Sequence, residues 1–505
     1  MVLSHPPAAS IITVSLYIGG AMPVISRRSV LGGVAMLPWA GGRVATARPV
    51  RLPLASVLAA DPLRPQYHLI APYGWMNDPC GPVWVRGRYH MFYQWGPDKA
   101  AFGDIHWGHA VSTDLVHWRN LPAALSPQPG GPDAQGVFSG CVVIDGARAV
   151  AFYTGIEPSV QCMATSDLDM MHWTRHPEPV IATPPEGLQV EGFRDPMVWK
   201  DGTRWCMVLG ANVHASPMGP GGVVLLYDSP DLLTWTYRRI LYGPTHIAGG
   251  YDDAMECPDF FALEASQVLV YSLGDTVYAA VGTFGQDRFH VRHVAPLGYG
   301  LFYAARTMLD ADGRRVVWGW IPEKPGRAKT AMQAGWNGVT SLPRVMTIGE
   351  DGLARVAPHP AIAMLEGPVF MQGAGHEPGH TDGPNARIRV SFSGQAPGRI
   401  IFGGRDAFLD LDYDPYRPGR ELIANGDAAP LPLADHSTLD ILVDASVIEI
   451  FASSGIGLST RAYGDAAGPF VLKMQGTFES ASIQARRMTP ISPDRLTADP
   501  EPTGG

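Results

Sequence analysis

The chain has 505 residues, of which 46% are hydrophobic, so it is long enough to bury two or more cores. Its formal net charge is −9 and its basic residues form no run, which argues against a nucleic-acid-binding surface and favours an uncharged ligand. Five cysteines without a CxxC pair exclude a disulfide framework and a structural zinc site, and leave one or two isolated disulfides open.

Residues 1–47 are predicted to be an export leader. The sequence SRRSVL at residues 26–31 is followed by an apolar stretch and by ATA at residues 45–47, the order of a twin-arginine leader with a small-residue cleavage site. Met22 is the candidate start. We therefore expect a mature chain that begins near Arg48 and is periplasmic or extracellular. The remaining chain has no apolar run of the ~20 residues that a membrane span needs.

An internal repeat runs from residue 65 to about residue 355. Its markers, each beside a strand–turn–strand passage, are Asp78, Ser139, Asp195, Asp259 and Asp310. A second motif, an Asp-Leu turn followed by Trp, recurs in step at residues 112–118, 166–173 and 229–235. Five units of 50 to 60 residues, rich in Gly and Pro turns, predict an all-β fold with a five-bladed β-propeller, because radial packing shields the edges of small sheets.

The composition changes after the repeat. Residues 356–370 are predicted to be a linker with one helical turn. In residues 371–490, strands such as 387–392 and 439–444 alternate apolar and polar side chains, which predicts a β-sandwich because each sheet then has one buried face. Residues 491–505 are rich in Pro, Asp and Gly and are expected to be a disordered tail.

Three acids, Asp78, Asp195 and Glu256, lie in the motifs WMNDPCGP, EGFRDPMVW and MECPDFF. If they occupy equivalent places in different blades, they converge on one central funnel, and paired carboxylates are the machinery of glycoside hydrolysis. Apolar neighbours and nearby anions are expected to raise the pKa of Glu256, which suits a proton donor. Asp78, on a turn with free backbone amides, is the candidate nucleophile. The alternative is that these acids only cap turns.

The motifs resemble the signature boxes of glycoside hydrolase family 32, the invertases, levanases and inulinases. Besides the three acid motifs, the matching boxes, in order, are FYQ (92–94), HWGHA (106–110), FSG (138–140), FYAA (302–305), WGW (318–320), GWNG (335–338), LPR (342–344) and VDASVIEIF (443–451). Within the family the chain looks most like acid invertases. The resemblance therefore covers almost all of residues 65–490.

The resemblance implies a five-bladed propeller with a sandwich, and a retaining mechanism on terminal β-D-fructofuranosides of sucrose or short fructans. It makes Asp78 the nucleophile, Glu256 the acid/base, and Asp195 the residue that grips the fructose hydroxyls. Further substrate-binding positions that it implies are Asn77, Gln94, Ser139 and Arg194, with Trp75, Phe102, Phe138 and Trp320 as pocket walls. Taken singly, such aromatic residues are more typical of cores.

Neither a metal nor a cofactor is predicted. His106 and His109 lie three apart on an expected strand and so point to opposite faces. The expected partner is a small carbohydrate; the pattern predicts no oligomeric state.

One residue departs from the family pattern. Cys80 stands where the family usually has Asn, beside the candidate nucleophile, and a thiol lacks the strong donor and acceptor of an amide. Two alternative functions remain open at this point. One is a fructosyltransferase that uses the same residues, and the other is a non-catalytic fructan-binding propeller, whose expected signature is a lost carboxylate.

Overall fold

The computed structural model describes residues 55–215, 219–245, 254–393, 396–417, 421–431, 434–466, 468–476, 478 and 481–493. Nearly all regular structure in these ranges is β-strand; the helices are α2 (Ala55–Ala60), α3 (Ala328–Ala334) and the 3-10 helix η1 (Pro360–Leu365). The predicted leader and residues 494–505 of the predicted tail lie outside the described residues. Among the described helices, none has the length and apolar character that crossing a membrane requires.

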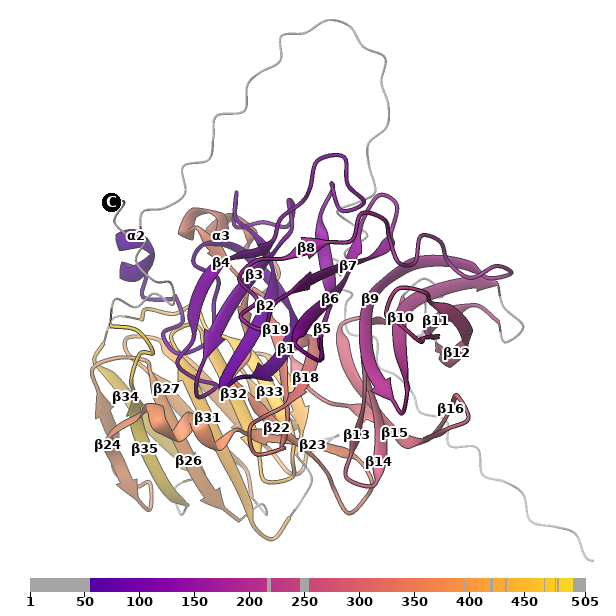
Figure 1. Cartoon of the computed structure of the whole chain (residues 1–505). Coiled ribbons are helices and arrows are strands. Elements are labelled where there is room, and N and C mark those ends of the chain that lie inside the picture. Colours follow the sequence, from indigo (N-terminus) through magenta and orange to yellow (C-terminus); the bar gives the residue numbers. More distant parts are fainter. Residues whose placement is uncertain are drawn as a thin grey trace, which may run out of the picture. The chain divides into compact units, whose positions relative to one another are not determined.

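Five small sheets follow one another along the first part of the chain, from indigo to salmon in Figure 1. The first contains β1 (Gly74–Val85), β2 (Arg88–Gly96), β3 (His106–Ser112) and β4 (Arg119–Leu125), and the second β5 (Val137–Asp145), β6 (Arg148–Gly155), β7 (Val160–Ser166) and β8 (Thr174–Arg175). The third contains β9 (Gln189–Asp201), β10 (Arg204–Ala215), β11 (Gly221–Ser229) and β12 (Thr236–Thr245), and the fourth β13 (Glu256–Leu263), β14 (Ser266–Leu273), β15 (Thr276–Gly285) and β16 (Arg288–Pro296).

The fifth sheet contains β18 (Tyr303–Leu309), β19 (Arg315–Ile321), β22 (Arg344–Ile348) and β23 (Ala354–Pro358), with β21 (Val339–Thr340) paired to β19. A short strand from this part of the chain, β20 (Trp336–Asn337), joins the first sheet in parallel with β1. The first strands of the five sheets also contact one another in a closed series, β1 with β5, β5 with β9, β9 with β13, β13 with β18, and β18 with β1. Residues on these five strands are therefore brought toward a common centre.

Each of these first strands departs from regular pairing where the chemistry-bearing residues lie. The register shifts fall at Met76/Pro79, Val137/Gly140, Arg194/Met197, Glu256/Asp259 and Tyr303/Arg306. Asp195, Cys257 and Ala304 have φ of 64°, 49° and 51°. Such bulges re-aim side chains. The fifth sequence marker was misplaced, because Asp310 follows the end of β18 and Ala304 lies at the bulge.

The Asp-Leu-Trp motif forms a hydrogen-bonded turn. In its first copy Ser112 Oγ accepts the N–H groups of Asp114 and Leu115 at 3.1 and 3.0 Å, and Trp118 Nε1 donates to the carbonyl oxygen of Leu115 at 2.8 Å. The copy at residues 229–235 repeats these bonds. In the middle copy the indole of Trp173 donates to Met170, so Met170, and not Leu168, matches Leu115.

Two larger sheets, the C-terminal sheets, form the rest of the described chain. The first has the order β17 (Tyr299–Gly300), β33 (Gly457–Arg461), β32 (Val447–Ala452), β31 (Ser437–Asp444), β26 (Ala386–Phe392), β35 (Ser482–Met488) and β24 (Glu366–Gly373). The second has the order β25 (Gly379–Thr381), β34 (Phe470–Gly476), β27 (Gly398–Gly403), β28 (Ala407–Tyr413), β29 (Glu421–Ala424) and β30 (Asp427–Pro430).

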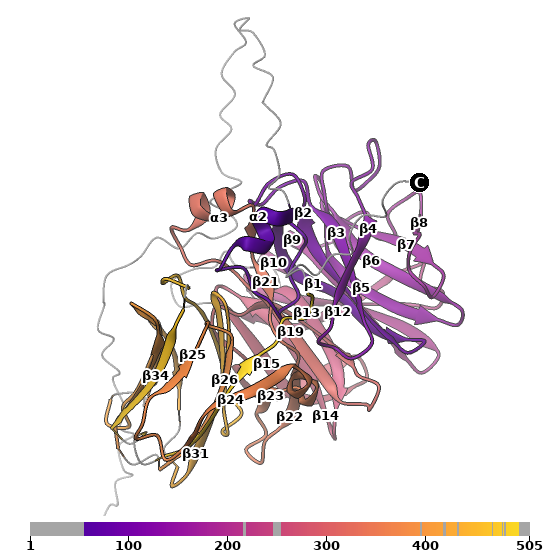
Figure 2. The ribbon, with the colours of Figure 1, turned by 90° about the vertical axis from the view of Figure 1, so that its left-hand side faces the viewer.

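The C-terminal sheets lie against each other (Figure 2) and share one hydrophobic core, with Ile388 and Ile441 from one sheet and Phe402 and Leu411 from the other. Alternate residues of β26 are buried along its second half, as its sequence pattern indicates. Between β23 and β24 only η1 intervenes, so regular strands extend further into residues 356–370 than the predicted linker.

Candidate active site

Asp78 lies at the β1 bulge, fully buried, among neutral hydrogen-bond donors. Asn77 Nδ2 donates to its Oδ1 at 2.8 Å, and Ser139 Oγ donates to its Oδ2 at 2.5 Å. Gln94 Nε2 lies 3.4 Å from the same Oδ2 and 2.5 Å from Ser139 Oγ. These donors fix both carboxylate oxygens and stabilise their negative charge.

The supporting residues come from two sheets. Asn77 and Gln94 lie on β1 and β2, and Asn77 Nδ2 also donates to Gln94 Oε1 at 2.9 Å. Ser139 comes from β5, where the backbone of β6 approaches so closely that a Cβ on Gly140 would lie 1.9 Å from the carbonyl oxygen of Phe152. Only glycine fits there, which explains the Ser-Gly pair.

Asp195 is also fully buried and sits at the β9 bulge. Its Oδ2 accepts the backbone N–H of Cys257 at 2.9 Å, and its own N–H donates to Thr154 Oγ1 at 3.0 Å. The sulfur of Cys257 lies 3.6 Å from this Oδ2 and 3.4 Å from Asp78 Oδ2. Asp78 and Asp195, predicted from different repeats, therefore meet around one side chain.

Glu256 opens β13 and is held by two donors. Arg194 Nη2 lies 2.5 Å from its Oε1, and the Tyr303 hydroxyl donates to its Oε2. Arg194 also approaches Asp195, with Nε 3.8 Å from Oδ2. Arg194 thus connects Asp195 and Glu256, and the three predicted acids form one group, called here the acid cluster (Asp78, Asp195 and Glu256).

Aromatic rings stand beside the acid cluster. Trp75 packs against Trp320 and Phe102 with ring centroids 5.6 and 6.0 Å apart, and Phe102 packs against Phe138 at 5.8 Å. Trp75 Nε1 donates to Asn77 Oδ1 at 2.7 Å, which ties the rings to the polar network.

The side chains of the candidate pocket differ in burial between its floor and its walls. Asp78, Asp195 and Ser139 are fully buried, whereas the four aromatic residues and Arg194 are half-buried. Polar groups at the base of aromatic walls are typical of sugar-binding pockets, where a few polar groups orient the ligand. The structure therefore brings all the sequence-predicted site residues together.

Cys80 lies at the border between this polar network, where it contacts Ser139, and the neighbouring core. It is fully buried in a hydrophobic cluster with Phe92 and Trp107, and its sulfur lies 3.4 Å from the carbonyl oxygen of Asp78. Burial, reinforced by the nearby charge of Asp78, raises the pKa of this thiol to about 12. All five cysteines are buried free thiols, so the disulfides left open by the sequence do not form.

Sequence reasoning missed several contributors to the site. Tyr303 lies in the FYAA box, which could have identified it, whereas Thr154 lies in no motif. Arg306, 1% exposed, donates to the carbonyl oxygens of Pro258 and Asp195 at 2.5 and 3.3 Å and so supports both bulges. Cys257 was visible only as the neighbour of Glu256.

No group of three or more His, Cys, Asp or Glu side chains in the described ranges is arranged to hold a metal ion. His106 and His109 do point apart. His109 is buried, stacks on Phe92 and lies 3.0 Å from His90 Nδ1, whereas His106 contacts Ser126.

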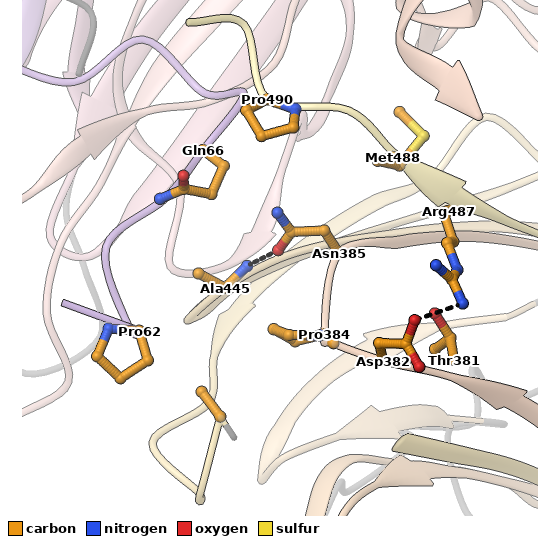
Figure 3. Close-up of a pocket in the computed structure, with 12 residues that line it drawn as sticks. Pro62, Gln66, Thr381, Asp382, Pro384, Asn385, Ala445, Arg487, Met488 and Pro490 are labelled. Atoms are coloured by element: carbon orange, nitrogen blue, oxygen red, sulfur yellow. Dashed lines mark hydrogen bonds and ion pairs between the residues drawn. The ribbon is translucent and has the colours of Figure 1, made fainter. Parts of the chain in front are cut away.

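A cavity of about 330 Å³ lies elsewhere, between residues 62–66 and the C-terminal sheets (Figure 3). Its lining includes Asn385, which accepts the N–H of Ala445, and the ion pair between Arg487 and Asp382. None of the predicted site residues lines it.

Comparison with known proteins gives one consistent result. Residues 68–360 match the model of the glycosyl hydrolases family 32 N-terminal domain. A sucrose-6-phosphate hydrolase of Escherichia coli is 32% identical over 79% of this chain and 89% of its own length, and a raffinose invertase of the same species is 32% identical over the same shares. The match runs through both groups of sheets.

Solved structures agree with the sequence relatives. A Bombyx mori GH32 β-fructofuranosidase, solved as a mutant in complex with sucrose, has a TM-score of 0.74 at 27% identity and covers 88% of this chain and 97% of its own. A sucrose-6-phosphate hydrolase of Lactobacillus gasseri, at 23% identity, has the same fold with a TM-score of 0.76 over 87% of this chain and 96% of its own.

Proposed function

The chain belongs to glycosyl hydrolase family 32, and from this premise we propose that it hydrolyses the terminal β-D-fructofuranosyl bond of sucrose or of short fructans. The observation that carries the proposal is the meeting of Asp78, Asp195 and Glu256, from three different sheets, beside aromatic walls. The E. coli relatives, named for sucrose 6-phosphate and raffinose, support a fructosyl bond as the target.

In the first step Asp78 attacks the anomeric C2 of the fructosyl unit while Glu256 donates a proton to the glycosidic oxygen. The C2–O bond breaks, the sugar leaves as an alcohol, and a fructosyl ester forms on Asp78. The donors Asn77, Gln94 and Ser139 hold the attacking carboxylate in place. Asp195 accepts hydrogen bonds from the fructose hydroxyls as the oxocarbenium-like charge develops.

In the second step Glu256 accepts a proton from water, the oxygen of which attacks C2 and releases Asp78. Arg194 and Tyr303 orient the Glu256 carboxylate for both transfers. Two inversions at C2 give net retention. Fructose should therefore appear first as the β-anomer in a time course followed by NMR, and α-fructose as the first product would contradict a nucleophilic Asp78.

We also propose that the five sheets are the blades of a five-bladed propeller over residues 65–355, followed by a β-sandwich over residues 371–490. The closed series of contacts among the five first strands supports the ring, and the shared core of the C-terminal sheets supports the sandwich.

The sharpest test of the function uses the leaving group. Glu256→Gln should lower kcat/KM for sucrose by about 10²–10⁴-fold, because its leaving oxygen needs a proton. The loss should be much smaller for a 4-nitrophenyl β-fructofuranoside, since nitrophenolate leaves without one. Equal losses on both substrates would remove Glu256 from the acid role. Product analysis with sucrose, sucrose 6-phosphate, inulin and levan identifies the preferred substrate, and transfer products in concentrated sucrose would indicate a fructosyltransferase.

Export remains a proposal that rests on residues 26–47 of the sequence. N-terminal sequencing of protein from the periplasm or medium should find a start near Arg48. Retention of residues 22–47 in exported protein would contradict a cleaved leader.

A further inference from the structure

The segment between β19 and β20, residues 322–335, is attached to the candidate pocket at both ends. Just before it, Trp320 pairs in register with Tyr303, the residue that donates to Glu256. At its other end Trp336 and Asn337 pair with Gly74 and Trp75. A movement of this segment, called here the rim segment, would therefore move two aromatic walls of the pocket.

The contact between the segment ends and the pocket is close. Gly338 follows β20 with φ of 80°, and a Cβ there would lie 2.0 Å from the carbonyl oxygen of Met76 and 2.6 Å from Trp320 Nε1. Only glycine allows the chain to pass between β1 and the Trp320 ring. The pocket wall and the end of the rim segment are therefore closely packed.

The first half of the rim segment is held by residues of the C-terminal part of the chain. Glu323 Oε2 accepts the hydroxyl of Tyr463 at 2.6 Å, and its Oε1 pairs with Arg461. The N–H of Lys324 donates to the same Tyr463 oxygen at 3.0 Å. The guanidinium of Arg327 lies over the Tyr463 ring, 4.1 Å from its centroid.

A second anchor is made by the Lys324 side chain. Its ammonium donates to the carbonyl oxygen of Asn425 at 2.6 Å and lies 3.0 Å from Asp427 Oδ2. The rim segment is thus held at consecutive residues by side chains and backbone from three parts of the C-terminal sheets.

Burying Arg461 costs desolvation free energy that stability alone does not explain. Its side chain is fully buried, and its Nε and Nη1 have no hydrogen-bond partner among the described residues. Burial lowers the pKa of Arg461, because desolvation disfavours its charge. Buried ion pairs are often no more stabilising than apolar side chains of similar size, but they fix geometry. The Arg461–Glu323 pair is therefore better explained by the position it imposes on the rim segment.

We propose that Glu323 and Tyr463 are positioning residues that set the leaving-group side of the substrate pocket, so that the C-terminal sheets take part in substrate selection. The inference rests on the proposed function, in which Glu256 protonates the leaving group. Trp320 is the backbone neighbour of Tyr303, which holds Glu256, so the rim segment begins on the side of the pocket where the leaving sugar lies.

The test compares two substrates that share the fructosyl unit, sucrose and methyl β-D-fructofuranoside. The first has a sugar as its leaving group and the second only methanol. Tyr463→Phe removes one hydroxyl and its two hydrogen bonds to the rim segment. It should lower kcat/KM for sucrose about fivefold, the effect of roughly one hydrogen bond, mainly through KM. For the methyl fructoside the change should stay below about twofold, since no leaving sugar contacts the rim.

Tyr416→Phe is the matched control, because Tyr416 lies in the turn after β28, in the C-terminal part of the chain, and is 78% exposed. Tyr416→Phe should have the wild-type kcat/KM for both sucrose and methyl β-D-fructofuranoside. Glu323→Gln keeps the shape of the side chain and removes the charge that faces Arg461. It should lower the ratio of kcat/KM for sucrose to kcat/KM for the methyl fructoside, as Tyr463→Phe does, and by more. Melting curves show that the variants compared are folded.

A loss of folded protein lowers both kcat/KM values by the same factor, so an unchanged ratio in Tyr463→Phe and Glu323→Gln would overturn the inference. If the wild type fails to hydrolyse sucrose and fructans, the proposed function fails instead. If the wild type hydrolyses them and the ratio does not move, only the positioning role of the rim segment fails.

Discussion

Asp78 and a second group of buried charged residues are held by different kinds of hydrogen-bond partner. In the acid cluster, the hydrogen bonds to Asp78 described above come from the neutral side chains of Asn77, Gln94 and Ser139. In the second group, His68, Arg344, Asp444 and Glu449, every side chain is fully buried and each carboxylate contacts His68 or Arg344. We call this second group the interface cluster, because it links the segment before β1, the strand β22 and the C-terminal sheets.

The interface cluster has a complete set of partners. His68 Nδ1 lies 2.7 Å from Asp444 Oδ2, and its Nε2 lies 3.0 Å from Glu449 Oε1. Both ring nitrogens face carboxylates, so the imidazolium form donates to both. Arg344 pairs with the other oxygen of Glu449, with Nε at 3.1 Å. With His68 protonated, two positive and two negative charges balance.

The partners of Asp78 and those of the interface cluster suit different roles. A charge buried only to join parts of a fold must be neutralised, because an unpaired buried charge is costly. A carboxylate that attacks carbon must stay charged. Neutral donors orient it and leave its charge available. The same amide substitution in the two groups should therefore have opposite consequences.

The largest expected effect belongs to Asp78. Asp78→Asn should lower kcat on sucrose by on the order of 10⁴-fold or more, because no nucleophile remains. The melting temperature should change by only a few degrees, since Asn keeps the shape and its amide can still accept one hydrogen bond. Steady-state kinetics and thermal melts measure the two quantities. A collapse of the melting temperature would instead give Asp78 a structural role.

Asp444→Asn is the matched substitution in the interface cluster. Asp444 accepts the N–H groups of Gln66, Tyr67 and His68 at 2.6, 2.8 and 2.9 Å, besides the ring of His68. Its neutralisation leaves the His68 charge buried and should lower the free energy of unfolding by about 3–5 kcal/mol.

The kcat of the Asp444→Asn protein that remains folded should match the wild type within about twofold, since the residue touches no predicted site side chain. Chemical denaturation and active-site titration give the two values. A large loss of kcat at unchanged stability would break the contrast between the clusters.

A smaller effect is expected from pH. Burial lowers the pKa of His68, but its hydrogen bonds to Asp444 and Glu449 and their charges outweigh burial, so the net pKa is raised. The stabilisation from His68 is then fully present below the unfolded pKa of about 6.5 and is lost as pH rises through the higher folded value.

Denaturation at a series of pH values from about 6 upward checks this sign. The free energy of unfolding of the wild type should fall with rising pH relative to that of His68→Gln, which has no proton to lose at this position. The opposite slope would mean that His68 is buried neutral. Burial raises the pKa of Glu449, but Arg344 and His68 lower it by more, so its net pKa is lowered. The stabilisation from Glu449 is therefore lost only in acid.

The smallest effect is expected at Cys80, which lies next to the acid cluster in sequence and packs in the neighbouring core. Cys80→Asn restores the residue usual in the family and should change kcat on sucrose by less than about tenfold, because the Cys80 sulfur lies against the backbone carbonyl oxygen of Asp78 and against Ser139. A change in the ratio of hydrolysis to fructosyl transfer, measured in concentrated sucrose, would show that a different acceptor resolves the fructosyl-enzyme. A loss beyond about a hundredfold would show that the pocket depends on the thiol.

The native Cys80 thiol should also resist alkylation, since it is buried and its raised pKa leaves almost no thiolate at neutral pH. Rapid labelling of Cys80 in the folded protein would contradict the described packing.

Local features of this protein can be predicted from its amino-acid sequence alone. The acid motifs at Asp78, Asp195 and Glu256 bring their own turn residues, so their positions at equivalent places in three of the five sheets followed from local pattern and regular spacing. The alternation in β26 likewise identified a sheet with one buried face. The predicted repeat positions at Asp310 and Leu168 are not equivalent to those in the other units. Turn residues cannot be told apart by type until the ends of the strands are known.

Which side chains meet depends on how the sheets pack in three dimensions. Tyr303 reaches Glu256 from another sheet, Thr154 holds the backbone of Asp195, and His68 finds Asp444 across 376 residues of sequence. Such contacts depend on how twisted sheets pack and how loops return, and a periodic pattern specifies the face of a strand but not its neighbour in space. For the same reason the support of the rim segment by Arg461 and Tyr463 has no signature in the sequence, although both its ends lie in recognisable motifs.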